Sequence, residues 1–150
     1  MERTPAEHLQ SFIDRYAPPV RATARHALAT TRKLLPGAVE LVYDSYNNLA
    51  VTFGPTERVA DAILSITLYP RWVSLFFTHG ATLPDPHRLL KGSGTRIRHI
   101  VLDGATVLDR PAVRALIAQA VQAGAPIDAT RRGQIVIKSI SAKQRPRLPA

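Results

Sequence analysis

The spacing of apolar residues changes near residue 38, and this change constrains the fold more than any other feature of the sequence. Before it, apolar side chains recur at the spacing of an α-helix, and beyond it they alternate as in a β-strand. The alternating pattern fills several consecutive segments, and helical spacing returns only after residue 109. The sequence therefore predicts an α+β domain in which helices pack on one face of a sheet.

Two helices are predicted before the change in spacing, and one near the end of the chain. Thr4 can cap the first helix, and Glu7 stands three residues later to complete a capping box. The second helix runs from about 19 to 35 and stops at a Pro-Gly pair. The last helix is predicted over 109–124, where a Gly-Ala-Pro sequence closes it.

Five central segments are predicted to be strands, and a sixth is predicted at the edge of the sheet. Asn47 and Asn48 supply turn chemistry between the first two strands, which should form a hairpin. We expect an antiparallel sheet of five to six strands, with N- and C-terminal helices on one face. The segments are 39–44, 49–53, 62–69, 72–78 and 96–102, with 135–140 as the edge strand.

The composition fits one domain that stays in water. With 150 residues and 45% hydrophobic residues, we expect a single domain over 1–140. Residues 141–150 are expected to form a flexible basic tail, because one leucine and two prolines offer too little apolar surface to offset the entropy of ordering. No stretch approaches the roughly 18–20 apolar residues of a membrane span. The absence of cysteine excludes disulfides and is consistent with a cytoplasmic protein that has no membrane partner.

An ordered series of short motifs runs through the middle of the chain: Leu35-Pro36-Gly37, Glu40, Tyr43, Tyr46, Val73-Ser74-Leu75-Phe76-Phe77, Gly80, Leu83, Asp85-Pro86, Leu89-Leu90, Gly92, Gly94 and Arg98-His99. Over roughly residues 20–125 this series resembles the YdhG-like domain-of-unknown-function family (domain of unknown function 1801). The resemblance implies a frataxin-like fold, in which helices 19–35 and 109–124 would pack on an antiparallel sheet. One branch of the family has been proposed to deliver iron, so the resemblance also suggests an intracellular iron-binding chaperone.

Two clusters of basic residues are candidate anion sites. The chain has 20 Lys and Arg against 11 Asp and Glu, and the net charge of +9 favours an acidic partner or a polyanion. On the second helix, Arg21, Arg25 and Arg32 lie within about 40° of one another and form a basic face. In the loop 91–95, glycines would let amides converge on an anion; the alternative is a glycine-rich turn with solvated arginines. The candidate residues of this loop site are Arg88, Lys91, Gly92, Ser93, Gly94, Arg96 and Arg98.

A third group of basic residues lies near the end of the chain. After Asp128 there are six basic residues and no acid: Arg131, Arg132, Lys138, Lys143, Arg145 and Arg147. Such an arm is expected to contact nucleic-acid phosphates without reading the bases. Because it lacks interleaved aromatic residues, stacking on single strands is not expected. The alternative is that these charges serve solubility alone.

Four aromatic residues are candidates for an apolar pocket with polar tips. Tyr43, Tyr69, Trp72 and Phe76 all fall in or beside predicted strands. The alternative is that these rings pack in the core of the sheet or against its helices.

Under the iron hypothesis the candidate metal ligands are Glu40, Asp44, His79 and Asp85. Hard cations favour carboxylate oxygen. Frataxins carry an acidic ridge on the first helix and strand, whereas the corresponding helix here carries arginines. Glu40 and Asp44 are four residues apart on one strand, about 13 Å, and are too distant to chelate one ion together. Asp85 also suits a helix cap before Pro86.

The leading functional hypothesis is a non-catalytic binding protein for an anionic ligand or polyanion, with no cofactor. The sequence contains no nucleophile-elbow or paired-acid motif, so an enzyme is the less favoured interpretation. Iron enters only with the chaperone alternative. The identity of the ligand and the oligomeric state stay open at this level.

Overall fold

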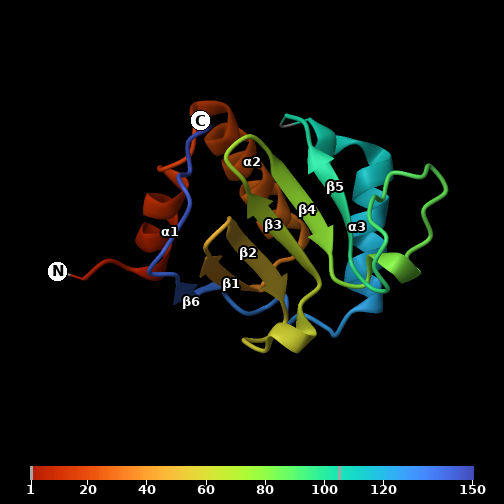
Figure 1. Cartoon of the computed structure of the whole chain (residues 1–150). Coiled ribbons are helices and arrows are strands. Elements are labelled where there is room, and N and C mark those ends of the chain that lie inside the picture. Colours follow the sequence, from red (N-terminus) through yellow and green to blue (C-terminus); the bar gives the residue numbers. More distant parts are fainter. Residues whose placement is uncertain (1, 105) are drawn as a thin grey trace.

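The computed structural model describes residues 2–104 and 106–150 and contains helices on one side of a six-stranded sheet (Figure 1). The helices are α1 (Pro5–Ile13), α2 (Pro18–Leu34) and α3 (Pro111–Ala123), with short 3-10 turns at Val59–Asp61, Gly80–Thr82 and Val107–Asp109. The strands are β1 (Val39–Asp44), β2 (Leu49–Gly54), β3 (Leu64–Leu68), β4 (Val73–Phe77), β5 (Arg98–Leu102) and β6 (Gln134–Ile140). The predicted α+β class is therefore confirmed. None of the helices in these two ranges is long and apolar enough to cross a bilayer.

The capping box predicted for α1 is present. The Thr4 hydroxyl accepts a hydrogen bond from the Glu7 amide at 3.2 Å, and the Thr4 amide donates to a Glu7 carboxylate oxygen at 3.4 Å. The start of α3 differs from the prediction. Arg110 occupies the cap position without a side-chain capping bond, and Asp109 instead forms an ion pair with Arg114 at 2.9 Å.

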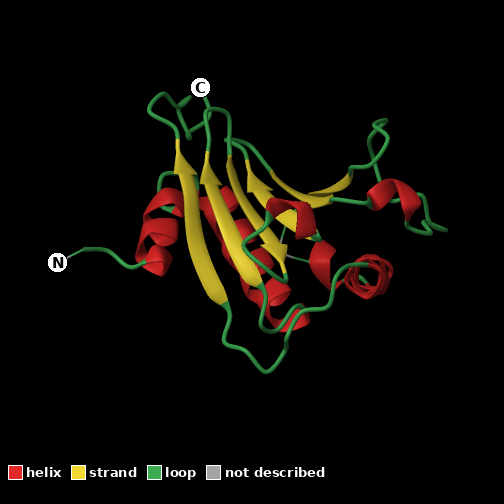
Figure 2. Ribbon diagram, turned by 90° about the horizontal axis from the view of Figure 1, so that it is seen from below, coloured by secondary structure: helices red, strands yellow, loops and turns green. Residues whose placement is uncertain are grey.

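The strands lie in the order β5-β4-β3-β2-β1-β6. Strands β1 to β5 pair antiparallel with their neighbours, as predicted, but β6 pairs parallel with β1. The expectation of a wholly antiparallel sheet is therefore wrong at this edge. The reason is physical: alternation of apolar residues records which face a side chain takes, and both strand directions produce the same alternation. Figure 2 shows how strongly the sheet twists from one edge to the other.

The hydrophobic core lies between the helices and one face of the sheet. Val51, Ile66 and Leu75 are cross-strand neighbours in successive pairs, and all three are completely buried. Helix α2 passes behind the middle strands in Figure 1 and contacts both β3 and β4. The apolar stripe of α3 joins the same core through Val113, Leu116 and Ile117. The helical and strand patterns of the sequence thus meet in one core.

The last ten residues pack against the domain, which differs from the expected loose tail. The Ser141 amide donates to the Asp44 carbonyl and the Arg145 amide donates to the Tyr46 carbonyl, both at 2.9 Å. Arg147 is only 3% exposed. The expectation rested on the lack of apolar surface, but the segment is held by hydrogen bonds and a buried charge rather than by hydrophobic burial.

Candidate functional site

The predicted basic face of α2 is occupied by partners within the protein. Arg32 makes a forked contact with the buried Glu40 carboxylate, with two N–O distances of 2.8 Å. Arg25 pairs with Asp14 of the segment after α1, and Arg21 donates to the Tyr16 carbonyl at 2.9 Å. These three guanidinium groups hold α2 to β1 and to the α1–α2 connection, so they do not present a free anion site.

In the loop around residues 91–95, the Arg98 guanidinium donates to the carbonyl oxygens of Gly94 and Ile97. Lys91 pairs with His99 through two backbone hydrogen bonds of 2.9 Å, which extends the edge of β5. The predicted loop residues Arg88, Gly92, Ser93 and Arg96 are all exposed. The arrangement therefore matches the alternative, a glycine-rich turn with solvated basic side chains.

The four candidate metal ligands are not brought together. Glu40 is engaged by Arg32, and Asp44 pairs with Arg147 at 2.9 Å. The Asp85 carboxylate accepts bonds from the Leu89 and Leu90 amides, but no helix follows it, so the predicted helix cap is wrong and this carboxylate closes a turn instead. Over the ranges that the structure describes, no three His, Asp or Glu side chains lie close enough to hold a metal ion.

The four candidate pocket aromatics separate into different places. Tyr43 lies on the open face at β1, and Phe76 lies on β4 with its ring 5.3 Å from that of His99. Tyr69 and Trp72 lie at the β3–β4 turn, where their rings stack 4.5 Å apart and 17° from parallel. Burial raises the pKa of the Tyr69 hydroxyl, and a hydrogen bond with Asn48 opposes the rise. Only this stacked pair borders a larger hollow.

This hollow is a groove of about 620 Å³ between the C-terminal segment and the β1–β2 and β3–β4 turns. We call it the tail groove. It brings together two aromatic, two amide and two basic side chains: Tyr69, Trp72, Asn47, Asn48, Arg71 and Arg145. No acidic residue is among the described residues that line it. Such a lining suits a ligand that is both anionic and flat, because guanidinium groups bind phosphate or carboxylate and exposed rings stack.

Arg147 holds the wall of the tail groove that the C-terminal segment provides. One of its guanidinium nitrogens lies 2.9 Å from Asp44 Oδ1 and also donates to the Ser45 and Asn48 carbonyls. The group lies 5.7 Å from the centre of the Tyr16 ring. The β1–β2 turn thus clamps Arg147, and the neighbouring Arg145 is left exposed, 5.4 Å from the centre of the Tyr46 ring.

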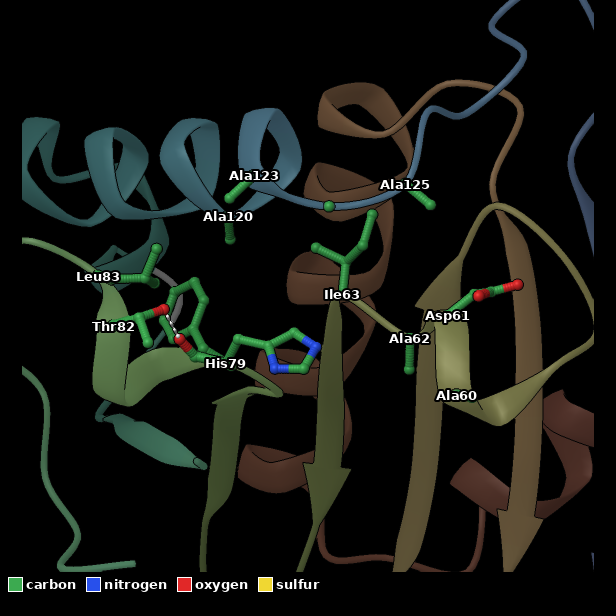
Figure 3. A pocket seen from close by; sticks show the side chains of 12 residues that line it. Ala60, Asp61, Ala62, Ile63, His79, Thr82, Leu83, Ala120, Ala123 and Ala125 are labelled. Atoms are coloured by element: carbon green, nitrogen blue, oxygen red, sulfur yellow. Dashed lines mark hydrogen bonds between the residues drawn. The ribbon is translucent and has the colours of Figure 1, made fainter. Parts of the chain in front are cut away.

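A second, smaller hollow lies at the end of α3 (Figure 3). Its volume is about 310 Å³, and Ile63 points toward the helix end, where Ala120 and Ala125 lie nearby. Gly124 lies close to Ile63 at this helix end, and a Cβ at position 124 would lie 3.0 Å from the Ile63 side chain. His79 borders the hollow, and Figure 3 shows its ring below Ile63, on the side away from α3. The lining is largely apolar, and no cluster of chemically active groups forms there.

Sequence reasoning located the aromatic rings and the basic arm separately and missed that they meet. Trp72 and Arg145 are 73 positions apart, and no periodicity relates them. Arg71 was not singled out, and Asn47 and Asn48 were noted only as turn residues. A signal was nevertheless present, because Asn47 and Asn48 mark one of the turns that border the groove and Pro70 marks the other.

Comparison with known proteins adds no relative: no family model, curated protein or solved structure matches this chain. The fold and the tail groove define it as an α+β protein with a basic, aromatic-lined surface groove. Its function has to be argued from that groove.

Proposed function

We propose that this protein is a non-catalytic binding protein whose partner is a polyanion, held at the tail groove and along the adjoining edge strand β6. The observation that carries the proposal is the meeting of Arg71 and Arg145 in a groove that has no acidic side chain among its described lining residues. Arg71 also donates to the Ala150 carbonyl at 3.3 Å. The guanidinium groups of α2 are engaged within the fold, whereas Lys138, Lys143 and Arg145 near the tail are exposed.

The edge strand extends this basic surface beyond the groove. Lys138 occupies the shift in register between β1 and β6, where Val42 pairs with Ile137 and Tyr43 pairs with Ser139. Arg132 precedes β6 and Lys143 follows it, and both are exposed. Arg131 also precedes β6, but its guanidinium group donates to the Pro55 carbonyl at 2.6 Å. The seven residues of β6 span about 20 Å, a length along which a strand of nucleic acid presents several phosphates.

The loop of residues 91–95, which we call the Lys91 loop, is a secondary contact in this proposal. It lies beside β5, at the opposite edge of the sheet from β6. Five inter-strand spacings separate those edges by about 24 Å. A short ligand cannot reach both, so we assign the principal contact to the side that combines positive charge with exposed rings.

We also propose that the chain has the frataxin-like architecture implied by its resemblance to the YdhG-like family, and that it acts in the cytoplasm. Helices on one face of a largely antiparallel sheet support that architecture. The parallel strand β6 lies outside the residues that carry the resemblance. The iron-chaperone alternative gains no support, since Glu40 and Asp44 are each engaged by an arginine.

Fluorescence anisotropy with a labelled 20-nucleotide single strand tests the proposal. Affinity should fall steeply between about 50 and 200 mM salt, because each phosphate contact releases counterion. The Lys143→Ala/Arg145→Ala double variant should bind more weakly, with the salt slope reduced by about 1.4, because each contact to a single strand contributes about 0.7.

The matched control is Arg58→Ala/Arg110→Ala, which removes the same charge from exposed positions away from the groove. It should keep the slope of the unmodified protein. Absence of binding at 50 mM salt, or an equal loss in both double variants, contradicts the proposal.

A further inference from the structure

We infer that the tail groove takes an unpaired nucleobase, stacked on the Tyr69–Trp72 pair, so that the polyanion recognised is single-stranded nucleic acid. This inference rests on the proposed function and names its ligand. It differs from the expectation, drawn from the sequence of the basic arm alone, that the protein does not stack on single strands. The arm itself has none, but the fold supplies them from the β3–β4 turn.

The stacked pair leaves a ring surface open. Trp72 is 44% exposed although its ring stacks on that of Tyr69. The indole borders both the tail groove and a smaller hollow lined by Val20 and Asp103. Burial of a tryptophan is strongly favourable, and an indole left this open beside a groove is suited to stacking with a flat ligand.

Charge and hydrogen-bonding groups surround the rings in the arrangement that a nucleotide requires. Arg71 and Arg145 line the groove, are exposed and can contact the phosphates that flank a stacked base; one Arg71 nitrogen also donates to the Ala150 carbonyl. Asn47 and Asn48 line it as well, and a primary amide both donates to and accepts from base edges. Arg145 also lies over the ring of Tyr46, which is 47% exposed and offers a further platform.

Single strands are favoured over duplex because of the stacking surface. In a duplex both faces of each base are covered by neighbouring base pairs, so an exposed indole has no free face to meet. Single strands present unstacked bases, and stacking on an aromatic side chain tolerates any sequence. The groove volume of about 620 Å³ falls in the range of nucleotide-sized ligand sites.

Trp72 is the only tryptophan, so its fluorescence reports on this site alone. A 15-nucleotide thymidine strand should quench it saturably and should bind more tightly than a duplex of the same length. Trp72→Ala should weaken single-strand binding about 5- to 150-fold, the range found for one stacked base, and leave duplex binding unchanged. Trp72→Phe should retain most of the affinity, because it keeps an aromatic ring.

Tyr43→Ala is the matched control, since it removes an aromatic ring from the open face of the sheet. It should bind like the unmodified protein. A thermal melt of each variant checks that it is folded. If Trp72→Ala fails to fold, Arg71→Ala provides the second test and should weaken single-strand binding while leaving the Trp72 ring in place.

The outcomes separate this inference from the proposed function. Equal binding of strand and duplex without quenching overturns the stacking inference and leaves a polyanion-binding protein. Quenching by thymidine monophosphate without measurable binding of the strand assigns the groove to a free nucleotide and overturns both the strand inference and the polyanion proposal. No binding of any of these probes at 50 mM salt overturns both as well.

Discussion

Arg147 and Asp44 form the most consequential contact at the scale of single residues. Their side chains are each 1% exposed and lie 103 positions apart in the sequence. Arg15 adds a longer contact to the other Asp44 oxygen at 3.5 Å. A buried pair contributes little relative to an apolar pair, but removing one partner leaves an uncompensated charge. Asp44 therefore makes the fold dependent on Arg147.

Replacing Arg147 by alanine should lower the free energy of unfolding by about 3–5 kcal/mol, because Asp44 would remain buried beside unsatisfied carbonyls. Urea denaturation measures the loss. The control is Arg145→Ala, an exposed neighbour whose replacement should change stability by no more than about 0.5 kcal/mol. Equal stability of the two variants would mean that the C-terminal segment is not docked.

Tyr16 gives the protein a dependence on alkaline pH. Its side chain is completely buried, and burial raises the pKa of its hydroxyl from 10.0 to about 12, with Arg147 opposing the rise. The folded-state pKa exceeds the unfolded one, so the stabilising contribution is fully present below about pH 10 and is lost as the pH rises toward 12. Two pKa units correspond to about 2–3 kcal/mol.

The free energy of unfolding should therefore fall more steeply between pH 10 and 12 than it does in Tyr16→Phe. At neutral pH that variant should lose about 1 kcal/mol, because the Tyr16 hydroxyl donates to the Leu68 carbonyl. Urea titrations of both proteins at pH 8, 10 and 11 provide the comparison. Parallel curves for the two proteins would contradict the assignment to Tyr16.

At the scale of elements, the C-terminal segment acts as a strap across the turns at one end of the sheet. It continues from β6 past the β1–β2 turn to the β3–β4 turn, where Arg71 donates to the Ala150 carbonyl at 3.3 Å. The strap is fixed at Arg147 and forms one wall of the tail groove. Its structural role and its proposed binding role therefore depend on the same residues.

A chain ending at Ser141 should lose about as much stability as Arg147→Ala, roughly 3–5 kcal/mol, because both changes leave the buried Asp44 carboxylate without Arg147. It should also lose quenching of Trp72 by single strands, since the groove loses a wall. Thermal melts and the fluorescence titration measure the two effects. If the truncated chain were as stable as the full one, the strap would not contribute to the stability of the fold.

Most elements could be predicted from the sequence because their signals are local. Alternation located β1 to β4 to within about two residues, and the capping box located α1. The direction of β6 could not be predicted, since it depends on the route of the chain from α3 to the far edge of the sheet. The helix cap expected at Asp85 is instead part of a turn, in which the carboxylate accepts hydrogen bonds from two amides and no helix follows.

At the scale of the whole molecule, the net charge is +9, and ion pairs within the fold determine which of the basic side chains stay exposed. Carboxylates at Asp14, Glu40 and Asp44 each engage an arginine on α2 or in the strap. Exposed positive charge is found along β6, in the strap, at the Lys91 loop and at Arg58 and Arg110. A count of charges predicts that a polyanion is attracted, but only the fold decides which charges are free to meet it.

The candidate site was less predictable than the fold for the same reason. Tyr69 and Trp72 were recognised as pocket candidates and the basic arm as a phosphate contact, yet no local pattern connects residue 72 to residue 145. Their meeting depends on the strap, and the strap depends on Arg147. A buried arginine near a chain end has the same sequence appearance as a solvated one.

Nuclear magnetic resonance mapping of the full chain with a 15-nucleotide single strand at low salt tests the central claim most directly. The amides that shift should lie in residues 45–48, 69–72 and 141–150, which surround the tail groove, with smaller shifts along β6. Shifts confined to α2 or to the Lys91 loop, or no shifts at all, would contradict the assignment of the binding surface to the tail groove.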